Sequence, residues 1–118
     1  MSVRPINVGV IGTGWIGEIR ARVCAEHPLV ESLHLAEIDP ARLERVAKAT
    51  GAKTATTDYH DVLARPDLDA VFVSTTPETT HYPITRDCLL ARKHTLLEKP
   101  MGLALKEADE LMALAREA

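Results

Sequence analysis

The sequence has few cysteines, few aromatic residues and no excess of positive charge. Its two cysteines, Cys24 and Cys88, lie far apart and show no metal-binding or redox spacing. So little cysteine favours a reducing compartment. The 17 Asp and Glu outnumber the 14 Lys and Arg, which gives a formal net charge of −3. The chain therefore lacks the basic excess with which proteins hold nucleic acids, and we expect no nucleic-acid partner.

Long hydrophobic runs are absent as well. No apolar stretch approaches the roughly 20 residues needed to span a membrane. The first eleven residues lack the continuous apolar core and the cleavage site of a signal peptide. We therefore expect a cytoplasmic protein without a membrane partner. With 46% hydrophobic and 26% charged residues, the composition is that of a globular protein, and 118 residues suffice for one domain with its own core.

The sequence does contain a regular alternation of short β-rich runs and helical patterns. Strands are predicted at residues 6–11, 33–38, 53–56, 69–74 and 94–97, and a helix is predicted after each, the last at about 104–116. This order predicts an α/β fold, a doubly wound parallel sheet with helices on both faces, as a single domain over residues 1–118. Ligands of such sheets bind at the carboxyl ends of the strands.

Two of these helices have predicted inward faces that depend on residue spacing alone. Ile16, Ile19, Val23 and Cys24 form the expected face of the first helix, and Leu105, Ala108, Leu111, Met112 and Ala115 that of the last. The second helix has clear boundaries, because Asp39 can cap it, Pro40 suits its first position and Gly51 suits its end.

A glycine-rich turn follows the first predicted strand and opens the first helix. Gly12 permits a tight turn, Gly14 lets the backbone approach a pyrophosphate, and Gly17 lets the helix pack close to the sheet. Backbone N–H groups at the helix start would hold phosphates without a basic side chain. The predicted cofactor-binding residues here are Gly12, Thr13, Gly14, Trp15, Ile16 and Gly17, in a Rossmann-type arrangement. A turn that uses glycine only for its shape is the alternative.

Glu37 ends the second predicted strand, close to the spacing of about 20 residues at which an acidic residue binds the adenosine ribose. Its carboxylate would accept hydrogen bonds from a ribose diol and repel a 2′-phosphate. The adjacent Ile38 and Asp39 include no base. We therefore predict NAD rather than NADP, with Glu37 and Ile38 at the ribose. Asp39 could also reach the ribose, although the helix cap is its expected role.

Polar residues also follow the fourth predicted strand. Thr75 and Thr76 are small enough to border a cofactor, and Pro77 stiffens the turn. His81 stands near the start of the next helix, where a single histidine taken alone indicates a packing or capping role.

The fifth predicted strand is followed by Glu98, Lys99 and Pro100. A surface ion pair of little energetic value is one interpretation of Lys99. The functional interpretation is a fixed cation beside the reacting centre, which orients a substrate hydroxyl and helps to remove its proton.

Together these motifs resemble the glucose-fructose oxidoreductase / inositol dehydrogenase family, also called Gfo/Idh/MocA. The elements that match, in family order and spacing, are Gly12-x-Gly14-x-x-Gly17, Glu37, Thr76-Pro77-x-x-x-His81 and Glu98-Lys99-Pro100. One departure is local: Arg92 stands where the family usually has a glycine before the Lys, so a helix ends without the usual glycine cap.

The resemblance implies the NAD-binding domain of a longer dehydrogenase, which transfers a hydride between nicotinamide and a sugar, cyclitol or related alcohol. It implies that Lys99 is catalytic. The residues assigned to the cofactor in these later motifs are Thr75, Thr76, Pro77, His81, Glu98 and Lys99. An Asp and a His of a second domain, absent here, usually complete the acid–base set. We therefore expect this chain to bind NAD, to turn over little or no substrate alone, and to self-associate through exposed apolar surface.

Two other functions stay open at this point. A dinucleotide-sensing or regulatory relative of the same family would keep the fold without chemistry, although an intact Lys99 weighs against it. A parallel-sheet domain for another ligand, such as a flavin or a nucleoside diphosphate, is the third hypothesis. Glu37 weighs against that one, because its carboxylate suits an adenosine ribose.

Overall fold

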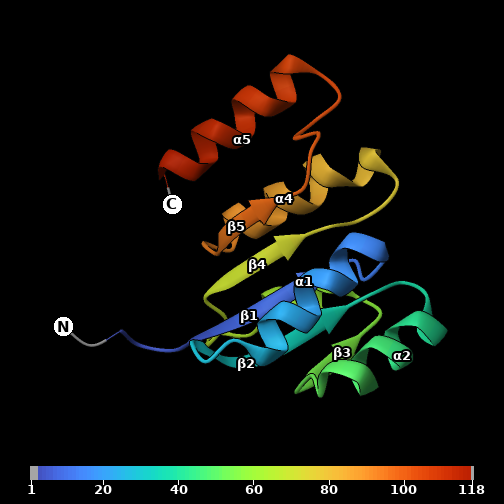
Figure 1. The fold of residues 1–118 in the computed structure, drawn as a ribbon. Helices are drawn as coiled ribbons and strands as arrows, with labels where there is room; N and C mark the ends of the chain where they lie inside the picture. Colours follow the sequence, from blue (N-terminus) through green and yellow to red (C-terminus); the bar gives the residue numbers. More distant parts are fainter. Residues whose placement is uncertain (1–2, 118) are drawn as a thin grey trace.

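The computed structural model describes residues 3–117 as a parallel sheet with helices on both faces (Figure 1). The strands are β1 (Ile6–Ile11), β2 (Val30–Ala36), β3 (Thr54–Thr56), β4 (Ala70–Val73) and β5 (His94–Leu97). The helices are α1 (Trp15–Glu26), α2 (Pro40–Thr50), α3 (Tyr59–Leu63), α4 (His81–Leu90) and α5 (Leu105–Glu117), with the 3₁₀ turn η1 (Glu78–Thr80) before α4.

The five strands are arranged in the order β3-β2-β1-β4-β5, and all four pairings are parallel. The chain runs outward from β1 to β3, then returns to the middle at β4 and runs outward to β5. This reversal between β1 and β4 confirms the predicted doubly wound sheet and creates a switch point between its two central strands.

Each face of the sheet has its own apolar core. The core below α1 and α2 consists of Val8, Val10, Ala21, Cys24, Leu33, Leu35, Leu43 and Val46. The core below α3 and α4 consists of Ile11, Ala36, Val62, Leu68, Val71, Val73, Ile84 and Cys88. Strands buried on both faces have continuous apolar sequences, which is why β1 and β4 could be located from sequence. Both cysteines are free thiols buried in these cores, and burial raises the pKa of the Cys88 thiol to about 12.

The predicted inward face of α1 is wrong in part, since Cys24 is the one of its four residues that is buried. Ile19 and Val23 are exposed, whereas the buried positions are Gly17, Ala21 and Cys24. These three residues also follow helical spacing but have small side chains. Small side chains let α1 lie close to the sheet, and this proximity decided which stripe of the helix faces inward.

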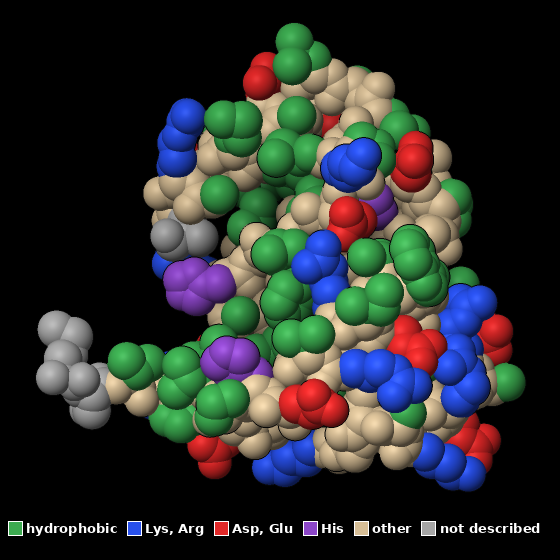
Figure 2. All heavy atoms as spheres, viewed as in Figure 1, with side chains coloured by type: hydrophobic (Ala, Val, Ile, Leu, Met, Phe, Trp, Pro, Cys, Tyr) green, Lys and Arg blue, Asp and Glu red, His purple; other side chains and the backbone are tan. Residues whose placement is uncertain are grey.

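The predicted inward face of α5 is also wrong in part. Leu111 is buried, but Leu105 is 80% exposed and Met112 47% exposed. The helix packs against α4, so it has one neighbouring helix rather than a sheet beneath it (Figure 1). Figure 2 shows hydrophobic side chains gathered over the middle and upper part of the face seen in Figure 1. Exposed apolar residues between the start of β5 and the start of α5 include Leu96, Met101 and Leu103.

Strand boundaries matter most at β2, because the candidate site begins where it ends. The strand starts three residues earlier than predicted, at Val30, and ends at Ala36. Glu37 is therefore the first residue beyond the strand. The predicted start of α2 is confirmed, since the Asp39 side chain accepts hydrogen bonds from the backbone N–H groups of Ala41 and Arg42.

Candidate functional site

The turn between β1 and α1 depends on two glycines that leave no room for a side chain. Gly12 has a φ of 88°, and a Cβ there would lie 2.7 Å from the carbonyl oxygen of Ser74. A Cβ on Gly17 would lie 1.8 Å from the carbonyl oxygen of Gly12. Both positions therefore require glycine so that the turn can fold back against β4 and the helix can start beside it.

Gly14 differs, because it faces open space. The nearest atom to a Cβ built there is a guanidinium nitrogen of Arg42, 4.0 Å away. Gly14 is the N-cap of α1, and no side chain of the described residues caps this helix. The N–H groups of the first turn thus stay available to an anion, with the positive end of the helix dipole behind them.

A cleft of about 210 Å³ lies at the carboxyl ends of β1, β2 and β4. This is the switch point of the sheet, where ligands of doubly wound folds bind. Of the predicted cofactor residues, those that line it are Gly12, Gly14, Glu37, Ile38, Thr75 and Thr76. Those outside its lining are Thr13, Trp15, Ile16, Gly17, Pro77, His81, Glu98 and Lys99. Ser74 also lines the cleft, and its buried hydroxyl has no hydrogen-bond partner within residues 3–117.

Glu37 is the buried acid of the cleft, with 6% of its surface exposed. One carboxylate oxygen accepts hydrogen bonds from the Thr13 backbone N–H at 2.8 Å and from the Thr13 hydroxyl at 3.1 Å. The other accepts from the Asp39 N–H at 3.0 Å. Burial acts to raise the pKa of Glu37, but these hydrogen bonds and the charge of Arg42 outweigh it and lower the pKa below its usual value. The carboxylate therefore stays ionised at neutral pH and braces the glycine turn.

Arg42 and Tyr59 line the cleft although the sequence analysis did not single them out. The Arg42 guanidinium lies 3.7 Å from the Glu37 carboxylate. The sequence neighbours of Glu37 carry no base, but the first turn of α2 brings this one back to the end of β2. Its position three residues after Asp39, the residue that caps the helix, was the available signal. Tyr59 donates a hydrogen bond to Asp87 of α4, and this bond fixes its ring in the lining of the cleft.

The loops after β4 and β5 are joined through His81. The ring is 3% exposed, with Nδ1 2.7 Å from the Pro100 carbonyl oxygen and Nε2 2.8 Å from the Thr75 carbonyl oxygen. Both nitrogens are thus engaged by backbone, and a contact of His81 with the cofactor stays a prediction. Thr75 is also held by its side chain, since its hydroxyl lies 2.6 Å from that of Thr80.

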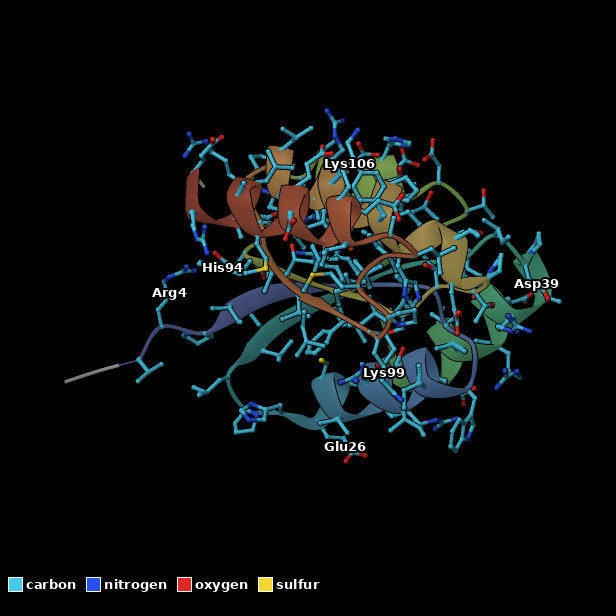
Figure 3. All side chains as sticks on the ribbon, turned by 90° about the horizontal axis from the view of Figure 1, so that it is seen from above. Arg4, Glu26, Asp39, His94, Lys99 and Lys106 are labelled. Carbon is cyan, nitrogen blue, oxygen red and sulfur yellow. The ribbon has the colours of Figure 1, made fainter. Side chains whose placement is uncertain are left out.

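Lys99 lies on the surface between two anchored neighbours. Glu98 forms an ion pair with Arg20 of α1 at 2.6 Å, and this bond is the main reason that the pKa of Glu98 is lowered. The Arg20 guanidinium lies 5.7 Å from the centre of the Phe72 ring, as in a cation–π contact. Figure 3 shows Lys99 near α1. The acid beside Lys99 therefore pairs with Arg20 rather than with the lysine.

The reversal of strand order, the glycine turn at a helix start and the buried acid after β2 define a Rossmann-type dinucleotide-binding domain. Residues 6–118 match the family model GFO_IDH_MocA, described as "Oxidoreductase family, NAD-binding Rossmann fold". The chain belongs to this family, as the resemblance had indicated.

Known proteins agree with this membership. Myo-inositol 2-dehydrogenase of Thermotoga maritima is 29% identical over 113 residues, which are 96% of this chain and 34% of that protein. The crystal structure of GenD2 from gentamicin A biosynthesis, in complex with NAD, matches with a TM-score of 0.90 and 32% identity over 98% of this chain and 32% of that one. KijD10, a 3-ketoreductase from Actinomadura kijaniata solved with NADP, matches with a TM-score of 0.85 and 36% identity over 97% of this chain and 36% of that one.

The chain thus spans about a third of the length of the relatives it matches. Within residues 3–117, no helix combines the length and apolar character that a membrane crossing requires.

Proposed function

We propose that this chain binds NAD(H) in the cleft at the switch point, as the cofactor domain of an oxidoreductase. The whole protein would transfer a hydride between the nicotinamide and a sugar, cyclitol or related alcohol. The observation that carries the proposal is the pairing of an open, uncapped helix start at Gly14 with the ionised Glu37 beside it.

The residues present suit the two ends of an adenosine diphosphate group. The N–H groups of the first turn of α1 would bind the pyrophosphate, and the space above Gly14 would admit it. Glu37 would accept a hydrogen bond from the ribose diol. The Ser74 hydroxyl, which has no partner among residues 3–117, adds a group that a ligand can engage. Arg42 offers a positive charge next to Glu37, so the preference for NAD(H) over NADP(H) is one of degree.

Lys99 is the residue we assign to chemistry. The bound cofactor would supply the hydride acceptor or donor, while the Lys99 ammonium would orient the substrate hydroxyl and help to move its proton. The Lys99 side chain is exposed and therefore accessible to a substrate. Its neighbours Glu98 and Pro100 are held by other elements, and they fix the position of the Lys99 backbone. Groups from a second domain would complete the acid–base set, so this domain alone turns over little or no substrate.

The proposal includes a cytoplasmic location, which the two free, buried thiols favour. It also includes self-association through the exposed apolar side chains near β5 and α5.

A fluorescence titration tests the cofactor assignment. Trp15, the single tryptophan, is the first residue of α1 and is 83% exposed, so a dinucleotide at the helix start should quench it. We expect saturable quenching that is tighter for NADH than for NADPH. Glu37→Gln should narrow that preference about tenfold, since a hydrogen bond to a charged group contributes roughly 1.5–3 kcal/mol.

Glu44→Gln is the matched control, because Glu44 is exposed on α2 and, within residues 3–117, its one ion pair is with Lys48 of the same helix. It should leave both affinities unchanged. An unchanged NADH-to-NADPH ratio in Glu37→Gln would overturn the ribose assignment. No quenching of the folded wild-type chain by either dinucleotide would overturn the proposed function.

A further inference from the structure

The His81 imidazole has hydrogen-bond partners that accept but cannot donate. Both of its ring nitrogens face backbone carbonyl oxygens, Nδ1 that of Pro100 at 2.7 Å and Nε2 that of Thr75 at 2.8 Å. A neutral imidazole carries one N–H, so one nitrogen lone pair would point at a carbonyl oxygen. Only the imidazolium donates to both. Only 3% of the residue is exposed, so water does not compensate for a ring nitrogen that lacks a hydrogen bond, and leaving it unpaired costs free energy.

His34 is a second buried histidine whose partners differ in kind from those of His81. It is also buried and also has a partner at each nitrogen, but the partners are the hydroxyls of Ser32 and Thr54. The Ser32 hydroxyl donates to the Asn7 side chain and so accepts from Nε2, whereas the Thr54 hydroxyl can donate to Nδ1. A neutral His34 with its proton on Nε2 is therefore satisfied at both nitrogens. Burial accordingly lowers the pKa of His34. Both histidines are buried, and they differ in the chemistry of their hydrogen-bond partners.

Charges around His81 are compatible with a cation. Glu98, the first residue after β5, forms an ion pair with Arg20 of α1. The acidic residue of the preceding turn η1 is Glu78, whose side chain is exposed. On the α5 side, Glu110 is occupied by the Tyr82 hydroxyl and by Arg86, both on α4.

The two carbonyls belong to the loops that border the proposed site. Thr75 lines the cleft, and Pro100 directly follows Lys99. On the other side of Lys99, Glu98 is held by Arg20 and by a bond from its own N–H to the Val73 carbonyl oxygen. The backbone of Lys99 is thus fixed from both neighbours, while its side chain is exposed.

We propose that His81 is a positioning residue, an imidazolium that donates one hydrogen bond to each loop and so holds Lys99 beside the cleft. The protonation state and the joining of the loops stand on the geometry alone. The consequence for Lys99 and for NADH affinity rests on the proposed function.

The ring nitrogens can be observed directly in the purified, ¹⁵N-labelled chain. Two-dimensional NMR correlations distinguish protonated from unprotonated imidazole nitrogens, and His81→Gln identifies the signals by their loss. We expect both nitrogens of His81 to carry a proton at pH 7, and one nitrogen of His34 to be unprotonated. An unprotonated nitrogen on His81 at pH 7 would overturn the proposal.

Hydrogen–deuterium exchange tests whether the ring joins the loops. In His81→Gln, segments 74–77 and 98–102 should both exchange at least tenfold faster than in the wild type. His94→Gln is the control, because His94 is an exposed residue of β5. Unchanged exchange in either loop of His81→Gln would contradict the joining role.

The pH profile of NADH affinity separates positioning from general support of the fold. In the wild type and in His94→Gln, affinity should fall as pH is raised through the deprotonation midpoint of His81 seen by NMR. His81→Gln should bind about tenfold more weakly, with no such step. A wild-type NADH affinity that stays constant across this midpoint would contradict the positioning role. If the wild type binds no NADH, the proposed function fails, while the NMR and exchange results still decide the state and the joining role of the ring.

Discussion

At the scale of single residues, the glycines of the turn after β1 divide into two kinds. Gly12 and Gly17 are required by the fold, since a side chain at either would collide with backbone atoms. Gly14 is not required in this way, because only the Arg42 guanidinium approaches its Cβ position. The open space at Gly14 serves the ligand that we propose. Two alanine substitutions can therefore separate folding from binding.

Gly17→Ala should lower the free energy of unfolding by about 1–3 kcal/mol, as overpacking does, because the Gly12 carbonyl would have to move. Gly14→Ala should cost less than about 1 kcal/mol, the difference between good and poor N-caps. It should nevertheless weaken NADH binding, because its methyl group fills the space above the helix start. Urea unfolding and NADH titration of both variants measure these effects. Wild-type NADH affinity in Gly14→Ala would contradict a pyrophosphate at this position.

At the scale of elements, α4 ends in a motif that normally uses glycine. The Lys93 N–H bonds to the Cys88 carbonyl oxygen and the Arg92 N–H to the Leu89 carbonyl oxygen, which is the Schellman pattern. Arg92 has a φ of 61° and occupies the left-handed position of this motif. Arg92 stands where the family usually has glycine, and it adopts the left-handed conformation that glycine favours.

Arg92→Gly should stabilise the protein by about 0.5–1 kcal/mol. A left-handed conformation costs a residue with a side chain roughly 1–2 kcal/mol, and the greater freedom of glycine in the unfolded chain offsets part of the gain. Thermal unfolding should show a higher Tm by about 2–6 °C. Gly51, at the end of α2, has a φ of 69°, so Gly51→Ala should shift Tm in the opposite direction. A lower Tm in Arg92→Gly would show that the arginine side chain has a stabilising contact.

At the scale of the whole molecule, a partly buried chain of polar side chains makes stability depend on pH. It runs from Thr54 of β3 through His34 and Ser32 of β2 to Asn7 of β1. Burial is the main reason that the pKa of His34 is lowered from 6.5. As pH falls below 6.5, the unfolded chain therefore binds a proton that the folded chain resists. This contribution is fully present above that pH and is lost as pH falls toward the folded pKa.

The free energy of unfolding should consequently decrease between pH 6.5, the ordinary histidine value, and about pH 5, before most carboxylates titrate. His34→Gln should flatten the profile in this window, and His94→Gln should retain the wild-type slope. Urea unfolding at several pH values measures both. An unaltered slope in His34→Gln would show that another group is responsible.

The prediction of the fold from sequence succeeded where local signals agreed. The β-branched runs located all five strands, and the Asp39-Pro40 and Gly51 signals located the ends of α2. It failed in part at the inward faces of α1 and α5, because helical spacing alone allows more than one stripe to be buried. The element against which each helix packs determined which stripe is buried. That element is the sheet for α1 and the helix α4 for α5.

The same division holds for the candidate site. The sequence by itself determined the glycine turn, the acid after β2 and the lysine after β5, since each is a local pattern tied to the end of a strand. Only the tertiary structure placed Arg42 beside Glu37, paired Arg20 with Glu98, and set the His81 ring between two carbonyls. These contacts join different elements, and their geometry depends on how the helices pack on the sheet, which no local pattern specifies.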